Sequence, residues 1–475
     1  MTFLLSIDVG TSGVRAALFD ARSAPGPGAQ TRNRRAFTTL SDFAELDADQ
    51  IVAEVIKTID ELLANSPGPI ELIAISAFWH SLIGIDAAGF PTTPLLTWAD
   101  TRAAQFAKAL RENFDEREIH ARTGCRFHPS YWPAKLRWLK HEHQEKFQDT
   151  RCWLGFAEYL CLRLFGTVAT SISMASATGL FNQRECDWDW DFVRDLGISR
   201  ETLPEIRSQI DVRVSESRWP ALAEARLVTI VGDGAANNIG AGCSTKDRIA
   251  LMIGTSGAMR VVFAGEPPAE LAPALWSYRV DQKRVVIGGA LSDGGGLVQW
   301  LGQSLKIDEG EVGALEPDAH GLTVLPFWSG ERSTGWSSDA RGGIFGLRQK
   351  TTPVEIMRAT LEAIAYRFAL IARALDQVAP NATIFASGNA LRSSPVWLQI
   401  IADVLGRQLL FGGTAEASIR GAALLGLEAV GKIGTIEEDS VAIEQVFEPD
   451  LERHARYQQG LARQEELYKR LYRME

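Results

Sequence analysis

Two short segments of this chain have the composition of a phosphate-binding turn. Each follows an apolar run, one near the N-terminus and one far downstream, and each reads Gly-Thr-Ser-Gly. Apolar runs bounded by glycine are typical of buried strands that end in tight turns. Glycine and small hydroxyl residues let backbone N–H groups converge on an anion. The repeat predicts two related domains that hold one polyphosphate between them. The turn residues are Gly10, Thr11, Ser12 and Gly13 in the first segment and Gly254, Thr255, Ser256 and Gly257 in the second.

Two charged residues beside the first turn suit the same ligand. Asp8 directly precedes the turn at the end of the predicted strand, where a carboxylate can hold Mg²⁺ beside the phosphates. The alternative is an aspartate that caps its own turn, and the repeated turn favours the metal site. Arg15 lies on the return strand and has the charge to neutralise a transferring phosphoryl group. A surface arginine of that strand is an equally good interpretation.

Asp233 stands between two glycines after a second apolar run, Val228–Val231. Flanking glycines permit a strained turn and the close approach of a ligand. A carboxylate in such a place can accept the proton of an attacking hydroxyl, as phosphoryl transfer to an alcohol requires. The alternative is a helix N-cap for the segment that follows, and the two roles are compatible. We therefore predict that Asp233 is the general base.

A set of aromatic, acidic and basic residues suits a polyol or sugar-acid substrate. Trp79 and His80 lie between two predicted strands, and Trp98, Asp100 and Arg102 begin a helical stretch. Aromatic rings stack on the C–H faces of a sugar while polar groups bind its hydroxyls, and Arg102 can pair with a substrate carboxylate. Each residue also has a structural interpretation. Trp98 and His80 would be core residues, Asp100 would be a helix N-cap, and Arg102 would be a charge on a helix surface.

Composition excludes several other classes of function. The chain has 475 residues, 46% of them hydrophobic, and a net charge of −10, so neither a nucleic-acid partner nor an anionic membrane is expected. Its five cysteines show no metal-binding or disulfide spacing, which is typical of reduced thiols in the cytosol. No signal sequence or membrane-length apolar run is present, so we expect a cytoplasmic protein. There is no Walker-type phosphate loop.

Alternating strand and helix patterns predict an α/β architecture. Residues 3–20 read as a β-hairpin, and residues 24–28 then break regular structure. Residues 47–64 have helical spacing, and Thr352-Pro353-Val354-Glu355 is a capped helix start. The predicted units are residues 1–244, residues 245–448 and an amphipathic C-terminal helix in residues 449–475 that packs on the second unit. The expected strands are 72–76, 82–85, 228–231 and 383–387, and residues 103–166 are expected to be mostly helical.

The chain resembles the FGGY carbohydrate kinases, within the wider actin and sugar-kinase fold group. The most specific stretch is Gly342–Leu347 followed by Glu355–Glu362, which is similar to the family's C-terminal signature, and Tyr131–Leu139 is similar to the N-terminal one. The resemblance covers nearly the whole chain. It implies two actin-like, ribonuclease H-like domains, each a mixed sheet with flanking helices, around a central nucleotide cleft.

The resemblance also implies roles for individual residues, with ATP and Mg²⁺ as cofactors. Asp8 would hold the metal ion, the first turn and Arg15 would meet the terminal phosphates, and Asp233 would be the general base. The second domain would contact the nucleotide through the second turn. The family usually has a glycine where Asn389 stands, and asparagine tolerates a positive φ. The further nucleotide contacts implied are Gly295, Gln299, Gly388 and Asn389.

Within the family, three segments look most like gluconokinases, namely Ile75–Ile83, Thr97–Arg102 and Ser173–Phe181. The prediction is ATP-dependent phosphorylation of a terminal hydroxyl of a small sugar acid, ketose or polyol, with D-gluconate first. The nearest alternative is D-xylulose or another ketose. The alternative of another class is an actin-like ATP-dependent switch protein. The oligomeric state stays open, with a homodimer among the options.

Overall fold

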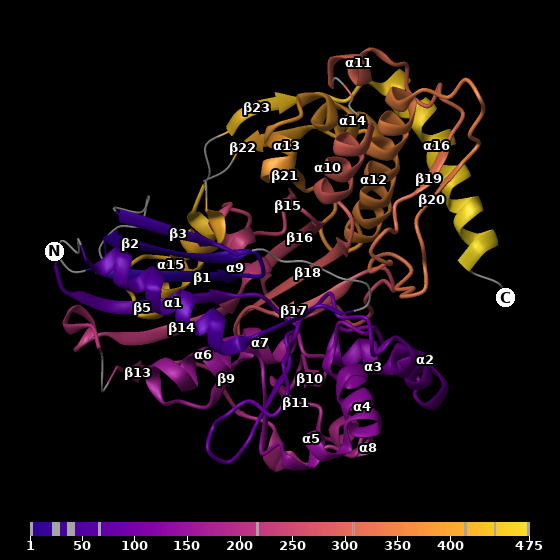
Figure 1. The fold of residues 1–475 in the computed structure, drawn as a ribbon. Helices are drawn as coiled ribbons and strands as arrows, with labels where there is room; N and C mark the ends of the chain where they lie inside the picture. The colour runs from indigo at the N-terminus through magenta and orange to yellow at the C-terminus, as the bar shows by residue number, and fades with distance from the viewer. Residues whose placement is uncertain are drawn as a thin grey trace.

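Two large mixed β-sheets organise the molecule, and they share one pattern of strand pairing (Figure 1). In the first sheet β1 pairs antiparallel with β2 and parallel with β5, and in the second β15 pairs antiparallel with β16 and parallel with β21. The predicted α/β fold with a duplicated mixed sheet is confirmed. In spatial order the first sheet contains β13 (Val212–Arg213), β14 (Arg226–Gly232), β5 (Ile70–Ala77), β1 (Phe3–Gly10), β2 (Gly13–Asp20) and β3 (Ala29–Arg34). The second contains β17 (Trp276–Arg279), β18 (Arg284–Leu291), β16 (Gly257–Ala264), β15 (Arg248–Ile253), β21 (Thr383–Ser387), β22 (Leu409–Gly412) and β23 (Ile443–Phe447).

The structure is a computed structural model, and it describes most of the chain. The described residues are 3–20, 29–35, 43–64, 68–214, 218–305, 307, 309–412, 416–440 and 443–472. The predicted break in regular structure at residues 24–28 lies outside them. Among the described residues, no helix is both long and apolar enough to cross a bilayer.

The first sheet forms because its central strands are apolar on both faces. Leu4, Leu5, Ile7 and Val9 of β1 are all fully buried, as expected for a strand covered by helices on both sides. Helix α1 (Ala48–Leu63) covers β2 and β3 on one face. Its N-cap is Asp47, whose side chain accepts from two backbone N–H groups of the first turn, which satisfies donors that the helix leaves unpaired.

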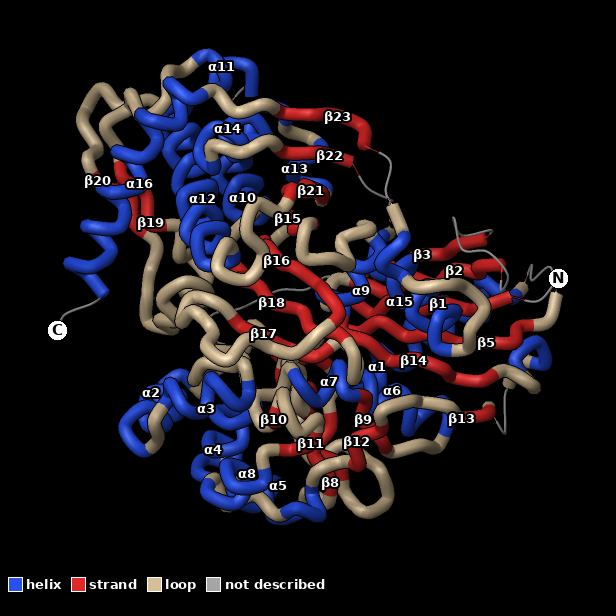
Figure 2. The backbone as a smooth tube through the Cα atoms, turned by 180° about the vertical axis from the view of Figure 1, so that it is seen from behind, coloured by secondary structure: helices blue, strands red, loops and turns tan. Residues whose placement is uncertain are grey.

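An inserted layer of short helices lies below the first sheet and has its own hydrophobic core (Figures 1 and 2). It carries Trp98 and the segment from Tyr131 to Leu139. The helices of the layer are α2 (Ala104–Asn113), α3 (Glu116–Thr123), α4 (Trp132–Glu142), α5 (Gln144–Asp149), α7 (Ile172–Ser176) and α8 (Trp190–Asp195). Helix α6 (Phe156–Phe165), in contrast, packs on β5 in the core of the first sheet. The short strands in and around the layer are β4 (Glu45–Leu46), β6 (Ile83–Ile85), β7 (Leu95–Leu96), β8 (Cys152–Leu154), β9 (Ala169–Ser171), β10 (Phe181–Asn182), β11 (Asp187–Trp188) and β12 (Glu205–Arg207).

The second sheet is covered by a long buried helix, α12 (Pro353–Leu375), and by α14 (Pro395–Leu405). The predicted start of α12 is confirmed, because Thr352 and Glu355 form a reciprocal capping box. The C-terminal helix α16 packs on α12, α14 and β19 and buries Tyr457, Leu461 and Tyr468, whereas Leu471 is exposed. The remaining elements here are α10 (Gly295–Leu305), α11 (Glu309–Ala314), β19 (Thr323–Leu325), β20 (Gly343–Phe345), α13 (Asn389–Arg392) and α16 (Leu451–Tyr472).

One helix of the second half belongs to the core of the first. Helix α15 (Ala417–Ala429) packs on β1, β5 and β14 of the first sheet and on α9 (Asp233–Gly240), and the two helices lie side by side in both views (Figures 1 and 2). A Cβ atom at Gly240 would lie 1.8 Å from the Ala417 carbonyl oxygen, and one at Gly421 would lie 1.8 Å from that of Ala236. The helices therefore touch backbone to backbone. The predicted domain boundary near residue 245 stays a prediction. Helix α15 lies after that boundary in the sequence but packs on the sheet formed by residues before it.

We predict that Gly421→Ala destabilises the whole protein. The added methyl group has no room against the α9 backbone, so the helices must separate, and overpacking of this kind costs about 1–3 kcal/mol or more. The apparent melting temperature should fall by about 1–3 °C, as measured by circular dichroism or differential scanning fluorimetry.

The matched control is Gly434→Ala, where the added Cβ would lie 3.8 Å from Glu438 Oε2, an ordinary contact. An unchanged melting temperature in Gly421→Ala would show that α9 and α15 are not packed as described.

Candidate active site

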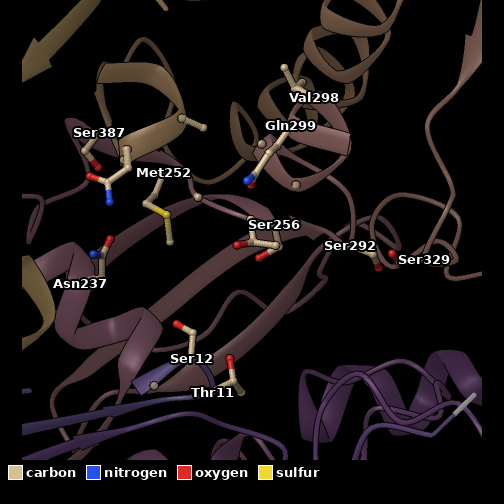
Figure 3. A pocket seen from close by; sticks show the side chains of 18 of the residues that line it. Thr11, Ser12, Asn237, Met252, Ser256, Ser292, Val298, Gln299, Ser329 and Ser387 are labelled. Carbon is tan, nitrogen blue, oxygen red and sulfur yellow. The ribbon is translucent and has the colours of Figure 1, made fainter. Parts of the chain in front are cut away.

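A deep cleft of about 1720 Å³ opens between the two sheets, and residues from both halves of the chain line it. Figure 3 shows Thr11 and Ser12 on one side of this cleft and Ser256 and Gln299 on the other. Most of the residues predicted from sequence lie in its wall. These are Asp8, Gly10, Thr11, Ser12, Arg15, Trp98, Asp233, Gly254, Thr255, Gly295, Gln299, Gly388 and Asn389.

The last glycine of each turn serves packing and does not line the cleft. A Cβ at Gly13 would lie 2.4 Å from the Asn33 carbonyl oxygen, and one at Gly257 would lie 2.7 Å from the Phe368 ring. Only glycine lets β2 and β16 lie this close to their neighbours. Both residues were predicted as nucleotide contacts, and the structure places them behind the turns that line the cleft.

The second turn is held in place by the glycines that begin α10. Gly295 N–H donates to the Gly254 carbonyl over 2.9 Å, and Gly294 and Gly296 N–H both donate to the Thr255 carbonyl. A Cβ at Gly295 would lie 2.5 Å from the Gly254 oxygen. The glycine run therefore fixes the turn against the N-terminus of α10 (Gly295–Leu305).

Asp8 ends β1 at the floor of the cleft and is almost completely buried. Ser76 Oγ donates to its Oδ1 over 2.8 Å, and Arg15 Nη1 lies 3.5 Å from its Oδ2. Burial raises the pKa of Asp8, while Arg15 and the Ser76 hydrogen bond lower it. Arg15 is also paired with Glu416, with 2.5 Å between Nη1 and Oε2. Glu416 immediately precedes α15, so this pair links the first hairpin to the helix that crosses from the second half.

Asp233 is the first residue of α9, directly after β14. Burial raises its pKa to about 6, nearby Asp8 adds to the effect, and Arg260 and Arg332 oppose it. Its Oδ1 accepts from the Gly234 N–H over 2.8 Å. A carboxyl group with this pKa, facing a cleft at a helix N-terminus, has the properties of a general base that works near neutral pH.

The glycines beside Asp233 make room for Trp79 and do not create backbone strain. A Cβ at Gly232 would lie 1.7 Å from the Trp79 indole, and one at Gly234 would lie 2.6 Å from it. Gly232 has an ordinary φ of −70°. The prediction of a strained turn is therefore wrong. The group that approaches these glycines closely is the Trp79 side chain, which is held in place because its Nε1–H donates to the Ser173 carbonyl.

Trp79 and His80 form the buried support behind the cleft wall. Rings from β17 pack against them, with Tyr278 lying 5.1 Å from Trp79 and 5.6 Å from His80 between ring centroids. His80 Nδ1 lies 2.7 Å from the Ala177 carbonyl oxygen, so Nδ1 carries the hydrogen. The pKa of His80 is well below its ordinary value, mainly because of burial, so the ring is neutral. Neither side chain is among the residues that line the cleft.

A buried lysine fixes the two segments that carry these candidates. Lys135 Nζ donates to the carbonyls of His80 and Thr97 over 2.7 and 2.8 Å. Burial lowers the pKa of Lys135 to about 7. The lysine of the segment Tyr131–Leu139 therefore acts as a clamp between backbone segments. Trp98, which follows Thr97, lines the cleft.

Asp100 and Arg102, which follow Trp98 in the sequence, pair with each other. Arg102 donates to both carboxylate oxygens of Asp100 and to Glu45, and its guanidinium lies 4.6 Å from the Phe43 ring centroid and 4.8 Å from that of Trp138. Asp100 also accepts from the Ala44 N–H. Neither side chain lines the cleft. The geometry thus gives Arg102 a structural role, and it offers no support for the predicted contact with a substrate carboxylate.

The cleft wall at the end of β21 depends on Gly388. Its φ is 110°, and a Cβ there would lie 2.2 Å from the Ile253 carbonyl oxygen, so a side chain is excluded. Asn389 begins α13 and is not among the residues with a positive φ. The left-handed backbone that we expected asparagine to tolerate therefore belongs to Gly388 alone, and the Asn389 side chain is free to line the cleft.

Sequence reasoning missed several cleft residues. Among them are the charged residues Arg332 and Glu416 and the polar residues His128, Ser130 and Asn237. It also missed Arg260, which lies beside Asp233 on β16: a Cβ at Gly234 would lie 3.2 Å from its Nε. The signal for Arg260 was present, because it is the one charged residue in the otherwise apolar strand Gly257–Ala264. Nothing comparable distinguishes the other residues.

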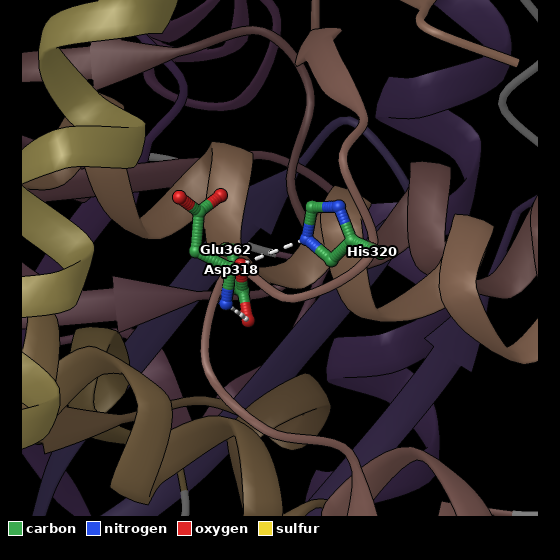
Figure 4. Close-up of side chains that lie close together, drawn as sticks. All are labelled: Asp318, His320 and Glu362. Carbon is green, nitrogen blue, oxygen red and sulfur yellow. Dashed lines mark hydrogen bonds and ion pairs between the residues drawn. The ribbon is translucent and has the colours of Figure 1, made fainter.

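A second cluster of acidic residues and histidine lies away from the cleft. Ligand atoms of Asp318, His320 and Glu362 lie within 4.8 Å of one another (Figure 4). His320 Nδ1 accepts from the Leu322 N–H, so its Nε2–H donates to Glu362 over 3.0 Å. Arg358 and Arg463 neutralise the two carboxylates. The cluster is therefore an ion-pair network, and since Arg463 belongs to α16 it fastens the C-terminal helix to α12.

Comparison with known proteins accounts for this arrangement. Family models for the N-terminal and C-terminal domains of FGGY carbohydrate kinases match residues 3–235 and 249–430. The chain belongs to the FGGY family of carbohydrate kinases. It is an ATP-dependent kinase, which decides against the alternative of an actin-like switch protein.

Relatives of different substrate preference are similarly close to the chain. It is 30% identical to a gluconokinase of Bacillus subtilis over 92% of this chain and 89% of that protein. It is also 30% identical to a glycerol kinase of Citrifermentans bemidjiense, over 96% of each. Two structures from Lactobacillus acidophilus, described as a gluconate kinase and a ligand-bound xylulose kinase, each have a TM-score of 0.89 and 26% identity, covering 99% of this chain and 98% of theirs.

The raised pKa of Asp233 predicts an acid limit to activity. The side chain accepts a proton only as a carboxylate, so kcat/KM should fall about tenfold for each pH unit below about 6 and be level above it. The measurement is a pH series of initial rates at low sugar concentration with saturating ATP.

Asp293 is the control, because burial also raises its pKa to about 6, against two hydrogen bonds from Ser329. In Asp293→Asn, kcat/KM should still fall below about pH 6 as it does in the wild-type enzyme. If that substitution removes this fall, the titrating group is Asp293 and the assignment to Asp233 is wrong.

Proposed function

We propose that this kinase transfers the γ-phosphoryl group of ATP to a terminal hydroxyl of a small sugar acid, ketose or polyol, with D-gluconate as the first candidate. One observation carries the proposal: Asp233 lines the cleft with a pKa raised to about 6, in the same cavity as Asp8 and both glycine-rich turns. Support for gluconate comes from its relatives, including a gluconokinase that is 30% identical.

In the proposed reaction the sugar binds mainly on the N-terminal half and ATP between the halves. Asp233 accepts the proton of the sugar hydroxyl while the hydroxyl oxygen forms a bond to the γ-phosphorus. The bond from that phosphorus to the β–γ bridging oxygen breaks, and ADP leaves with the electron pair. Closure of the cleft would exclude water, so that the sugar and not water receives the phosphoryl group.

The residues at the cleft floor fit a magnesium ion. Mg²⁺ prefers one or two carboxylates together with water and substrate phosphates, and Asp8 offers a buried carboxylate oriented by Ser76. When bound there, the ion would neutralise charge on the β- and γ-phosphates. Arg15 supplies a second positive charge at the same place. In this structure it is paired with Asp8 and Glu416, so an incoming triphosphate would compete with Glu416 for its guanidinium.

The glycine-rich turns would hold the phosphates by their backbone. Gly10, Thr11 and Ser12 line the cleft from the first sheet, and Gly254 and Thr255 line it from the second. The nucleoside would lie toward Gly388 and Asn389, where apolar residues of α10, α12 and α14 also line the wall. These residues are Val298, Met357, Leu361 and Trp397.

We predict that D-gluconate gives the highest kcat/KM of a panel that also contains D-xylulose, D-ribulose, glycerol and erythritol. The assay couples ADP release to NADH oxidation, with ATP and Mg²⁺ saturating. A higher value for a ketose would leave the kinase mechanism in place and replace the substrate. ADP release that no sugar accelerates would contradict the proposed function itself.

We predict that Asp233→Ala lowers kcat by about 10²–10⁴-fold, which is the contribution expected of a general base, and leaves the Kd for ATP within about threefold. Stopped or coupled assays give kcat, and calorimetry gives the Kd. Asp211→Ala is the control for loss of an aspartate, because Asp211 pairs with Arg226 at the surface. Near-normal turnover in Asp233→Ala would refute the assignment.

A further inference from the structure

Arg332 is a cation of the cleft wall that forms no ion pair with any carboxylate among the described residues. It lines the same cleft as Asp233. Among the residues that the structure describes, no ion pair or side-chain hydrogen bond engages its guanidinium, and its Nε is buried without a partner. A buried donor without a partner is costly, and in a binding site such a group indicates an acceptor supplied by the ligand.

The residues on either side of Arg332 hold it in position. Glu331 pairs with Arg367 and accepts from Tyr468 Oη, so the adjacent carboxylate is already engaged. Ser333 N–H donates to the Ala290 carbonyl, and Ser333 Oγ accepts from the Ala290 N–H over 3.1 Å. Arg332 therefore projects from a segment that is fixed on both sides, and a preorganised guanidinium loses little entropy on binding an anion.

The surroundings of Arg332 distinguish it from the cations near the phosphates. Its guanidinium carbon lies 5.5 Å from the Trp98 ring centroid, and the cleft wall beside Trp98 contains His128 and Ser130. The pKa of His128 is well below its ordinary value because of burial, and Arg332 is the charge that lowers it most. His128 is therefore neutral and does not compete for an anion. Arg260, in contrast, lies beside Asp233 and has the larger effect of the two arginines on its pKa.

We propose that Arg332 binds the carboxylate of a sugar-acid substrate against the Trp98 face and thereby selects sugar acids over neutral sugars. This inference rests on the proposed function. The planar guanidinium can donate two parallel hydrogen bonds to a carboxylate, while the ring of Trp98 covers the adjacent C–H surface. The carbon chain of the acid then runs from Arg332 toward Asp233, which places the carboxylate and the reacting hydroxyl at opposite ends of the substrate.

The test compares D-gluconate with D-gluconamide, its neutral amide of the same stereochemistry, in the full-length enzyme. Hydrogen bonds to a charged group contribute enough for a preference of about 10- to 150-fold. Arg332→Gln should lower kcat/KM for gluconate by that factor, mainly through KM, and change the value for gluconamide by less than about threefold. Arg332→Lys keeps the positive charge but cannot donate two parallel hydrogen bonds to a carboxylate. It should therefore retain part of the preference for gluconate over gluconamide. Calorimetric titration of gluconate without ATP should show the same loss of affinity.

Arg102→Gln is the matched control, because Arg102 was the arginine predicted from sequence to bind the carboxylate and is already paired with Asp100 and Glu45. It should leave the ratio of kcat/KM between acid and amide unchanged. A ratio that collapses in Arg102→Gln and persists in Arg332→Gln would overturn the proposal.

Two other outcomes would also overturn it and separate it from the proposed function. An equal loss of kcat on both substrates in Arg332→Gln would place this arginine at the transferring phosphoryl group. A wild-type enzyme that phosphorylates neutral sugars without preference for the acid would refute the carboxylate site while leaving the kinase mechanism intact. Melting temperatures and ATP affinity of each variant show whether it is folded.

Discussion

The active-site geometry of this kinase depends on the contact between α9 and α15. Two glycines, Gly240 and Gly421, let the helix backbones meet with no side chain between them. Asp233 begins the first helix, and Glu416 precedes the second. Interiors packed this closely do not deform gradually, so the two helix ends keep a fixed separation. Asp233 and Glu416, the partner of Arg15, are thereby positioned by one rigid pair of helices, although they lie far apart in the sequence.

Next to this helix pair, the cleft contains two aspartates, Asp8 and Asp233, in surroundings that disfavour their ionised forms. Burial raises the pKa of Asp8 and of Asp233, and the two groups also repel each other. Such an arrangement destabilises the unliganded protein and is typical of catalytic sites. The large apolar cores beneath both sheets offset that cost. A divalent ion and a hydroxyl proton are the ligands that would relieve it, which agrees with phosphoryl transfer to an alcohol.

Several residues that resemble family motifs have structural roles here. Lys135 joins the backbone segments of His80 and Trp98, and Glu362 receives Arg358 and His320 far from the cleft. Trp79 fills the space that Gly232 and Gly234 leave beside Asp233. Lys135 and Trp79 act through neighbours that do line the cleft, Trp98 and Asp233. The cleft also contains Arg332, whose Nε has no partner among the described residues and which no motif marked.

The sequence by itself determined the duplicated α/β fold, because apolar runs that end in Gly-Thr-Ser-Gly specify a strand and a turn through purely local chemistry. For the same reason it located Asp8, Asp233 and most of the cleft-lining turn residues. Only the tertiary structure decided that Arg102 is consumed by Asp100 and Glu45 while Arg332 is not. It also decided that α15 belongs to the first core. Whether a charge is paired, and which sheet a helix covers, depend on how separate segments pack together. Arg102 reaches Glu45, 57 positions away, and α15 reaches Ser6 of β1, 413 positions from Ile419. Local pattern carries no information about such packing.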